Sequence, residues 1–185
     1  MYNKKSDFSL PQFIYGQAFS PEECQQIKNY TLSLPNLTAE PGNGAVDNYT
    51  RKCMSKTFGV NEDTFWILDR IMNYVISADR QYFHFDVVGL EKAQYLEYIE
   101  GDYFYWHMDQ SSNVRAFFRR RLSSIVFLSK PEDYEGGKLE ITPSEQNTIL
   151  GEQGYMVIFP SYKTHRVTPV TKGKRCTLVT WGLVD

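Results

Sequence analysis

Residues 154–170 read GYMVIFPSYKTHRVTPV, and this stretch shows the pattern that governs most of the chain. Two short runs rich in β-branched and aromatic residues, YMVIFP and HRVTPV, are separated by the polar segment SYKT. Runs of this kind, bounded by turn residues, are typical of β-strands. The stretch therefore predicts two strands joined by a short connection.

The same pattern recurs from Tyr82 onward. The other runs are QYFHFDVVG, AQYLEYIEG, YFYWHMD, LSSIVFLS, GKLEIT and CTLVTWGLV. Together they predict about eight strands, preceded only by helices. This order favours an α+β, mainly β protein: a jelly-roll core (double-stranded β-helix) of about eight antiparallel strands, buttressed on one side by N-terminal helices.

Two segments in the first half of the chain show helical patterns. SPEECQQIKNYTLSL offers Ser20 as N-cap, Pro21 at N1 and Glu23 at the capping-box position, and predicts a helix to about Leu34. TFWILDRIMNYVIS, residues 64–77, carries apolar residues three and four apart and predicts a second, amphipathic helix. Between them PNLTAEPGNGAVDN, rich in Pro, Gly and Asn, is expected to be a mobile loop that covers a site.

Length and composition favour one domain over residues 1–185, with helical support at about 20–80 and the jelly-roll core at about 82–185. A formal net charge of -2 and a pI near 5.9 argue against a nucleic-acid partner, because such proteins need a basic face.

We expect no export signal and no membrane segment. Three cysteines without CxxC spacing suggest neither a disulfide framework nor a zinc site, which favours a cytoplasmic protein.

A candidate metal site lies in YFYWHMDQSS, residues 103–112. On a strand, His107 and Asp109 would point to the same face, side by side. His165, at the start of a later strand, is the candidate third ligand. Two histidines and one carboxylate leave open positions on a metal, as in non-haem Fe(II) oxygenases. A bare HxD pair also fits a surface hydrogen bond or a turn, so the spacing alone leaves both interpretations open.

The residues around this pair resemble the Fe(II)/2-oxoglutarate-dependent dioxygenases, specifically the prolyl 4-hydroxylase-like family. The resemblance runs from about Gln94 to Trp181. RLSSIVFLSKPEDYEGGKLEI is similar to the family segment LS…LS…YxGGxL, and residues 154–181 are similar to its ending G…FPS…HxVxPVxxGxR…W. The family lead-in YxxGxx(aromatic)xxHxD is matched by Tyr98, Gly101, Phe104, His107 and Asp109.

The resemblance implies an enzyme that hydroxylates an unactivated C–H bond with Fe(II), 2-oxoglutarate and O₂, and with ascorbate as an optional reductant. His107, Asp109 and His165 would be the catalytic metal ligands. Arg175, ten positions after His165, would bind the far carboxylate of 2-oxoglutarate, with Tyr98 as a second candidate contact. Halogenases of this family replace the carboxylate ligand with a small residue, so Asp109 argues against halogenation.

The aromatic residues that line the iron pocket stay undecided in the sequence. Many relatives carry tyrosine three positions before the first histidine, where this chain has Phe104. Strict alternation would instead point Tyr103 and Tyr105 to the iron face. His84 has no carboxylate at the family spacing and is assigned to packing or surface. In YEGGKL, Gly136 and Gly137 are expected to form a tight turn with a structural role.

The segment QSSNVRAFFRRR, residues 110–121, is expected to be a loop at the rim of the iron pocket. In one interpretation Arg115 and Arg119 steer an acidic substrate toward the metal. In the other the segment is a solvated basic loop with two aromatic residues tucked into the core.

The substrate is the least determined feature. The resemblance favours a prolyl or other residue within a peptide or protein, and a free amino acid or small metabolite is the alternative. A nucleic-acid demethylase is disfavoured by the acidic pI.

A different class, a non-catalytic jelly-roll binding module, would have no reason to keep Arg175 in register with His165. The sequence gives no indication of oligomeric state.

Overall fold

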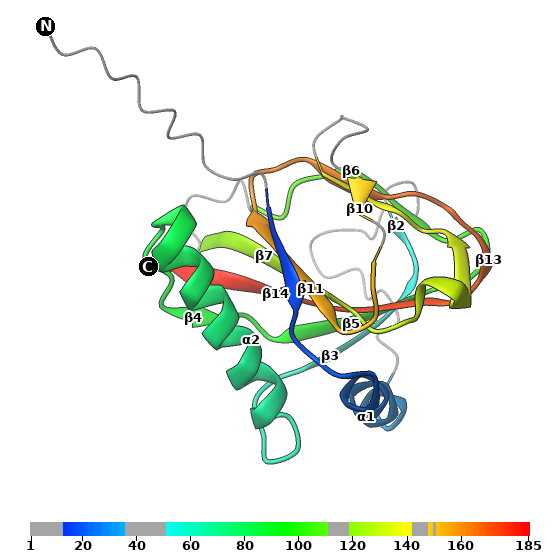
Figure 1. Ribbon diagram of the computed structural model, residues 1–185, viewed down its shortest axis with the longest axis horizontal. Coiled ribbons are helices and arrows are strands. Elements are labelled where there is room, and N and C mark those ends of the chain that lie inside the picture. Colours follow the sequence, from blue (N-terminus) through cyan, green and yellow to red (C-terminus); the bar gives the residue numbers. More distant parts are fainter. Residues whose placement is uncertain (1–12, 36–50, 111–118, 142–147, 150) are drawn as a thin grey trace, which may run out of the picture.

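The computed structural model describes residues 13–35, 51–110, 119–141, 148–149 and 151–185. Two antiparallel sheets face each other across the middle of this part of the chain (Figure 1). The larger sheet has the strand order β1 (Ile14–Gln17), β11 (Tyr155–Pro160), β7 (Arg119–Phe127), β14 (Arg175–Val184), β5 (Ala93–Tyr98) and β3 (Met54–Phe58), and β4 (Gly89–Leu90) also pairs with β14.

The smaller sheet has the order β10 (Thr148–Ile149), β9 (Leu139–Ile141), β12 (His165–Val167), β6 (Tyr103–His107) and β2 (Arg51–Lys52). A separate two-stranded ribbon pairs β13 (Val170–Gly173) with β8 (Tyr134–Gly136), just after the 3₁₀ turn η2 (Pro131–Asp133). Two facing antiparallel sheets confirm the jelly-roll core that the strand pattern predicted.

The larger sheet is apolar on both faces. Along β14, Cys176 and Leu178 join the cluster that packs against the helices, whereas Val179 and Trp181 join the cluster between the two sheets. Strands β5, β7 and β11 divide their side chains in the same way. This follows from the two-residue period of a strand. The sheet thus separates a helical layer from the space in which the candidate site lies.

Two helices cover the outer face of the larger sheet. Helix α1 (Pro21–Leu32) begins with the expected capping box: the Glu23 amide donates to the Ser20 hydroxyl, and the Ser20 amide donates to the Glu23 carboxylate. Helix α2 (Phe65–Ala78) buries an apolar stripe that consists of Ile67, Leu68, Ile71, Val75 and Ala78. Both helices are therefore confirmed, each within two residues of its predicted bounds.

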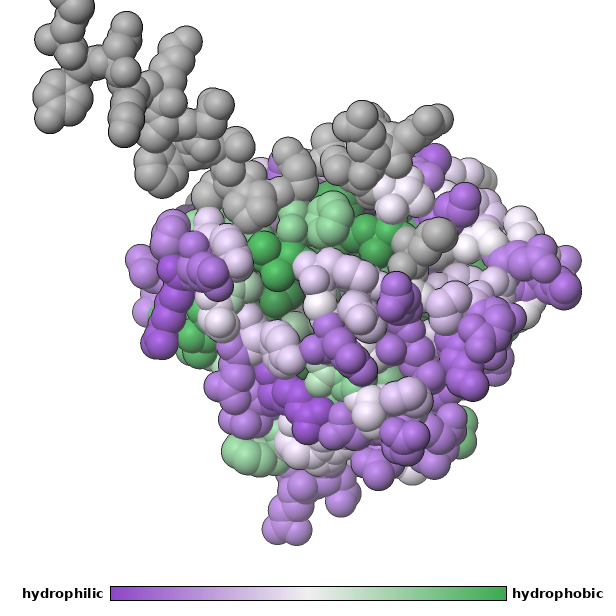
Figure 2. Space-filling view, in the orientation of Figure 1, coloured by the Kyte–Doolittle hydropathy of each residue, from purple (hydrophilic) through white to green (hydrophobic). Residues whose placement is uncertain are grey.

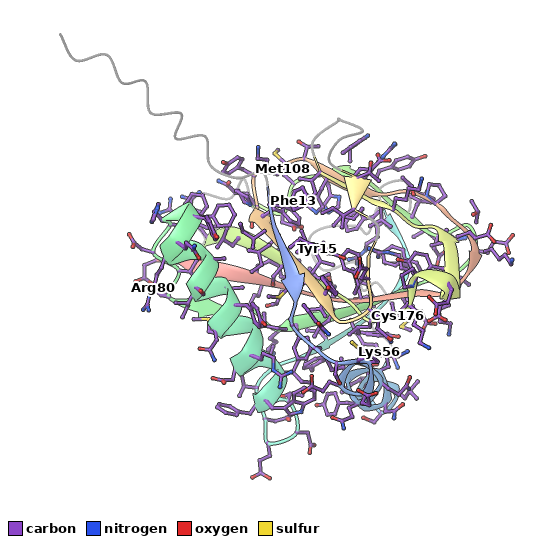
Figure 3. The ribbon with its side chains drawn as sticks, viewed as in Figure 1. Phe13, Tyr15, Lys56, Arg80, Met108 and Cys176 are labelled. Atoms are coloured by element: carbon purple, nitrogen blue, oxygen red, sulfur yellow. The ribbon has the colours of Figure 1, made fainter. Side chains whose placement is uncertain are left out.

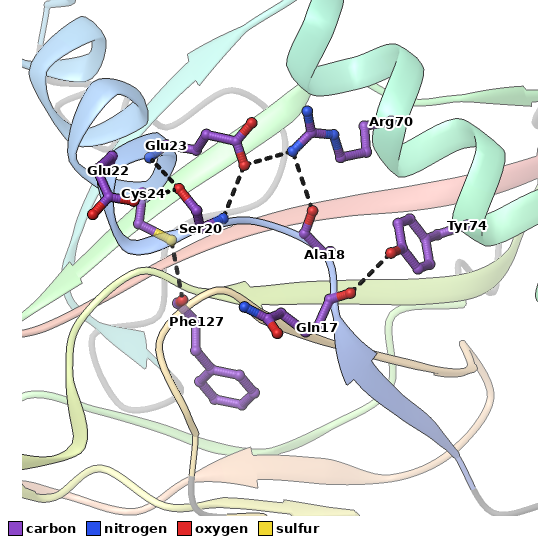
Figure 4. A network of polar contacts seen from close by, with 9 residues as sticks. All are labelled: Gln17, Ala18, Ser20, Glu22, Glu23, Cys24, Arg70, Tyr74 and Phe127. Atoms are coloured by element: carbon purple, nitrogen blue, oxygen red, sulfur yellow. Dashed lines mark hydrogen bonds and ion pairs between the residues drawn. The ribbon is translucent and has the colours of Figure 1, made fainter.

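A polar network joins the two helices to β1 (Figure 4). Nη1 of Arg70, on α2, lies 2.6 Å from Oε2 of Glu23, on α1, and 3.3 Å from the carbonyl oxygen of Ala18. The Tyr74 hydroxyl donates to the Gln17 carbonyl at 2.8 Å. The Arg70 guanidinium also lies over the Phe19 ring, 4.9 Å from its centroid. These contacts hold the helical layer in place.

The first half of the chain differs from the expectation that only helices precede Tyr82. It contributes three strands, β1, β2 and β3, and two of them form the edges of the larger sheet. The sequence of β3, MSKTF, does not indicate a strand, because its polar residues Ser55 and Lys56 are buried. Nζ of Lys56 donates to the Thr31 carbonyl at the end of α1 at 2.7 Å, and Figure 3 shows Lys56 beside that helix.

The run QYFHFDVVG is not the expected strand. Its first residues end the π-helical turn η1 (Asp79–Phe83), and His84 and Asp86 adopt positive φ angles of 57° and 61°. The Asp79 carboxylate accepts hydrogen bonds from the backbone amides of Phe85 at 2.8 Å and Val87 at 2.9 Å. A side chain that bonds local amides in this way replaces a strand partner, so only β4 pairs with the sheet here.

The two expected loops lie largely outside the described residues. For PNLTAEPGNGAVDN only the first residue is described. In QSSNVRAFFRRR, residues 111–118, which include Arg115, lie outside the described residues. The end of the second segment differs from the expectation, because Arg119, Arg120 and Arg121 belong to β7 and not to a loop.

The described surface is mainly hydrophilic over the helical side. Figure 2 shows apolar residues gathered on the same face where Figure 1 places β1 and β11. Within the described ranges, no helix has both the length and the apolar character needed to cross a bilayer.

Candidate metal centre and its cavity

The two candidate histidine ligands lie directly opposite each other on neighbouring strands. His107 ends β6, His165 begins β12, and the two residues are paired in the antiparallel register of the smaller sheet. Their ring centroids are 4.1 Å apart. The sequence interval between them is bridged by β7 through β11, so the contact depends on the fold and not on local spacing.

Both imidazoles are oriented by a carbonyl oxygen two residues earlier in the chain. Nδ1 of His107 lies 2.7 Å from the Tyr105 carbonyl, and Nδ1 of His165 lies 2.9 Å from the Lys163 carbonyl. A carbonyl oxygen can only accept, so Nδ1 carries the proton in each neutral ring. Each Nε2 is then left with a free lone pair, the arrangement in which histidine binds a metal.

Asp109 supplies a carboxylate between the two Nε2 atoms. Its Oδ1 lies 3.7 Å from Nε2 of His107, and its Oδ2 lies 3.4 Å from Nε2 of His165. Asp109 follows the end of β6, and its amide donates to the Ser161 carbonyl at 3.0 Å. Its two-residue offset from His107 therefore brings the two side chains together as predicted, although Asp109 itself is outside the strand.

Two buried serines fix this carboxylate. The Ser123 hydroxyl, on β7, donates to Oδ2 of Asp109 at 2.7 Å and lies 3.0 Å from the Ser161 hydroxyl. Both serine side chains belong to fully buried residues. They stand in LSS and FPS, and their role could not be predicted from the sequence because nothing local places them beside Asp109.

The donor atoms of these three side chains all lie within 4.8 Å of one another, and no other such group is found in the described residues. A divalent ion bound at about 2.1 Å would set adjacent ligand atoms about 3 Å apart, somewhat closer than the carboxylate–imidazole separations of 3.4 and 3.7 Å. Burial lowers the pKa of His107 to about 4, with the neighbouring His165 and the Arg51 charge as further causes. The neutral ring that a metal requires is thus the stable form.

Phe104 is the aromatic residue that faces this group. Its ring stacks on His107 with a centroid distance of 3.5 Å, whereas the side chain of Tyr105 is exposed. The register of β12 against β6 shifts between His165 and Val167. His165 pairs with His107, and Val167, two positions later on β12, pairs with Phe104, three positions earlier on β6. This bulge in β6 places residues three apart on one face and corrects the strict alternation that pointed Tyr103 and Tyr105 inward.

A cavity between the two sheets extends from these three residues to Arg175. Tyr98 and Arg175, paired across β5 and β14, form its inner end. Arg175 is 1% exposed, yet its Nε and Nη2 have no hydrogen-bond partner among the described residues. Its guanidinium carbon lies 5.1 Å from the Tyr98 ring centroid and 5.5 Å from that of Phe127. An unpaired buried cation is costly, so this end of the cavity fits an anion.

The wall of the cavity carries further unpaired polar atoms. Oγ1 of Thr177 and Nε1 of Trp181 are buried without a hydrogen-bond partner in the described chain. Both residues share the Arg175 face of β14 and line the cavity. Thr177 was missed in the sequence, although it stands two positions after Arg175 on a predicted strand, and the two-residue period would have found it.

Tyr98 stands beside Arg175 with its hydroxyl protonated. Burial raises the pKa of Tyr98, with Cys53, which hydrogen bonds its phenol, as a further cause. Cys53 is half-buried, and Cys24 and Cys176 are buried free thiols. A protonated phenol next to the guanidinium adds a second potential donor to an anion at this end.

Gly137 makes room for Arg175, and Gly136 makes room for a neighbouring strand connection. A Cβ on Gly137 would stand 2.8 Å from Cδ of Arg175, and one on Gly136 would stand 2.2 Å from the Pro169 carbonyl oxygen. Both glycines also have positive φ angles. The expected tight turn is not seen, because Gly136 ends β8, but both glycines allow a close approach, and Gly137 does so at the candidate site.

Other candidate residues lie away from the cavity. His84 is exposed at the end of η1. Nη2 of Arg119 lies 3.3 Å from the Asp185 carbonyl, and Arg119 is not among the residues that line the cavity.

The second half of the chain is similar to known sequences. Residues 93–182 match the model of the 2OG-Fe(II) oxygenase superfamily. The chain is 45% identical over 85 residues to a PKHD-type hydroxylase of Hyphomonas neptunium and 39% identical over 89 residues to one of Shewanella frigidimarina. These segments cover 44% and 45% of this chain, but only 38% and 39% of the two relatives.

Solved structures show the same fold over nearly the whole chain. A viral collagen prolyl hydroxylase of Paramecium bursaria Chlorella virus-1, solved with 2OG, has a TM-score of 0.74 at 20% identity and covers 95% of this chain and 97% of its own. A prolyl-4-hydroxylase of Pseudomonas putida has a TM-score of 0.69 at 18% identity, with 97% and 96% covered. Residues 93–182 are thus similar to the 2OG-Fe(II) oxygenase superfamily, and the chain shares the fold of solved prolyl hydroxylases.

Proposed function

We propose that this protein is an Fe(II)- and 2-oxoglutarate-dependent dioxygenase that hydroxylates an unactivated C–H bond. One observation carries the proposal: a single cavity is lined both by the His-Asp-His group and by the buried guanidinium of Arg175, whose Nε and Nη2 have no hydrogen-bond partner in the described chain. A 2-oxoglutarate molecule has a metal-chelating keto acid at one end and a carboxylate at the other. The two ends of the cavity offer the matching partners.

The residues would act as follows. His107, Asp109 and His165 would hold Fe(II) through two Nε2 atoms and one carboxylate oxygen, with Ser123 and Ser161 fixing that carboxylate. Arg175 would bind the far carboxylate of 2-oxoglutarate, with Tyr98 as a second donor. Apolar side chains such as Leu96, Ile125 and Val179 would exclude water from the cavity. When bound, iron and 2-oxoglutarate supply the activation of O₂, which gives the hydroxylated product, succinate and CO₂.

Two classes of substrate fit the proposed hydroxylase. The named relatives are PKHD-type hydroxylases, and one structural neighbour, from Trichoplax adhaerens, is a prolyl hydroxylase in complex with a hypoxia inducible factor peptide. These names favour a prolyl or other residue in a peptide or protein. A free amino acid or small metabolite is the second class.

We also propose that the described residues act as one domain. The helices α1 and α2 pack on the outer face of the sheet whose inner face lines the cavity. The helical support and the site are therefore parts of one packed unit.

The experiment is a cosubstrate assay on the parent chain. With added Fe(II) and ascorbate, 2-oxoglutarate should be converted to succinate, and candidate peptides or amino acids should gain the mass of one oxygen atom. Omitting Fe(II) should abolish both products. A chain that binds neither a divalent metal nor 2-oxoglutarate would instead be the non-catalytic binding module.

A further inference from the structure

A second hollow opens outside the candidate metal centre and continues from its cavity. It shares Gln94, Phe104, Asp109 and Trp181 with the inner cavity, and adds five residues, four of which carry charge. The added residues are Arg51, Thr57, Glu91, Lys92 and Arg120. A substrate that reaches a metal at Asp109 would lie in this groove, so its charges bear on what the protein accepts.

One cation and one anion of the groove neutralise each other. Nη2 of Arg120 lies 2.6 Å from Oε1 of Glu91, and Nε of Arg120 lies 2.7 Å from Oε2 of the same carboxylate. The Arg120 guanidinium carbon is also 3.6 Å from the Trp181 ring centroid. Two parallel bonds and a stacked ring fix this pair in place. Glu91 is therefore not available to the other cations.

Arg51 and Lys92 are left without a carboxylate partner in the described chain. The Arg51 guanidinium carbon lies 5.5 Å from the Phe104 ring centroid, next to the stacked His107. Lys92 comes directly before β5 and two positions before Gln94, and its stem lies beside Gly59. Asp109 faces the two histidines, and a metal bound there would add positive charge to this end of the groove.

We propose that this groove binds a carboxylate of the substrate through Arg51 and Lys92, so that the protein prefers substrates with an acidic group near the oxidised carbon. The inference rests on the proposed hydroxylase function and narrows its substrate class. A guanidinium and an ammonium in one groove offer charge-assisted hydrogen bonds to a carboxylate. The described lining residues of the groove come from strands and their connections.

The test measures binding to protein loaded with Mn(II) and saturated with 2-oxoglutarate. The probes are a pool of short proline-containing peptides with one glutamate, a matched pool with glutamine, and a third with phosphoserine. Free glutamate and glutamine form the small-molecule arm. In either the peptide or the amino-acid arm, the parent should bind the acid at least about tenfold more tightly than its amide, and the arm that responds identifies the source of the carboxylate.

The variants assign that preference to residues. In the double variant Arg51→Gln, Lys92→Gln the preference should fall below about threefold, and in Arg51→Lys, Lys92→Arg it should return because the charges are restored. Lys52→Gln is the control: Lys52 is adjacent in sequence, but its Nζ pairs with Asp102 at 3.4 Å. It should keep the preference of the parent.

Several results would overturn the proposal. They are equal binding of acid and amide, no binding of any probe, tighter binding of the phosphoserine pool, or an unchanged preference in the double variant. Mn(II) and 2-oxoglutarate binding is measured on every protein. A parent that binds both but shows no acid preference refutes only the carboxylate groove, whereas a parent that binds neither refutes the proposed function itself.

Discussion

The Ser123 hydroxyl donates a hydrogen bond of 2.7 Å to Oδ2 of Asp109. Ser123 lies on β7 of the larger sheet, while Asp109 follows β6 of the smaller one. The bond therefore ties the carboxylate of the candidate metal centre to the opposite side of the jelly roll. The orientation of Asp109 depends on how the two sheets face each other.

Replacing Ser123 by alanine should weaken metal binding. The carboxylate would lose its donor and rotate more freely, and losses of this kind typically cost roughly 10- to 100-fold in metal affinity. Calorimetric titration with Mn(II) measures the effect. Ser124→Ala is the matched control, because Ser124 is also buried but its hydroxyl donates to the Thr180 carbonyl. Equal metal affinity in Ser123→Ala and the parent would show that Asp109 is held by other contacts.

The second prediction concerns the histidines. Removing either Nε2 leaves two ligands, so His107→Ala and His165→Ala should each lose most of the affinity for Fe(II) and Mn(II). His84→Ala, which changes a histidine outside the group, should bind as the parent does. Stoichiometric metal binding by the double variant of His107 and His165 would contradict the assignment.

Much of this site follows from sequence spacing, and the rest depends on tertiary structure. His107, Asp109 and Arg175, which the spacing singled out, line one cavity, and their roles as ligands stay predictions. Phe104 required the bulge in β6, which no local pattern indicates. Ser123 and Ser161 become neighbours of Asp109 only when β7 and the end of β11 meet.

The fold, too, follows in part from local sequence patterns and in part from tertiary contacts. The jelly roll and both helices were predicted from periodicity and capping residues. Strand β3 was missed because Lys56 is buried by bonding to the end of α1, a contact far away in sequence. The strand predicted at QYFHFDVVG does not form, because the Asp79 carboxylate accepts hydrogen bonds from two backbone amides that would otherwise donate to a neighbouring strand.

The third prediction uses the glycine behind Arg175. A methyl group on Gly137 would press on Cδ of Arg175 and would sit on a backbone with a φ of +55°. Gly137→Ala should therefore displace the guanidinium and weaken 2-oxoglutarate binding more than Mn(II) binding. The control is Gly89→Ala, where an added Cβ meets nothing within 4 Å. If Gly137→Ala bound 2-oxoglutarate like the parent, the tight packing at Arg175 would have no role in ligand binding.

The fourth prediction concerns the ion pair between the helices. The hydrogen bond from Arg70 lowers the pKa of Glu23 below its ordinary value of 4.5. A lowered carboxyl pKa contributes stability above the unfolded value and loses it as the pH falls through the folded value. Glu23→Gln keeps a capping-box acceptor but removes the charge.

The variant should therefore unfold at a lower temperature than the parent at neutral pH, and this difference should shrink as the pH falls below about 4. Thermal unfolding followed across this range measures it. Glu62→Gln, at an exposed position before α2, should show no such convergence. A constant difference between Glu23→Gln and the parent at all pH values would mean that the ion pair is not its cause.

The central claim is that one cavity holds a metal at His107, Asp109 and His165 and a 2-oxoglutarate carboxylate at Arg175. Titration of 2-oxoglutarate into Mn(II)-loaded parent and Arg175→Leu proteins tests it most directly, with Lys174→Leu as the neighbouring control. The Arg175 variant should bind Mn(II) normally but 2-oxoglutarate more than about a hundredfold more weakly, and without ligand it should be at least as stable as the parent, since an unpaired buried charge is gone. Equal 2-oxoglutarate affinity in the two proteins, or no binding by the parent, would contradict the claim.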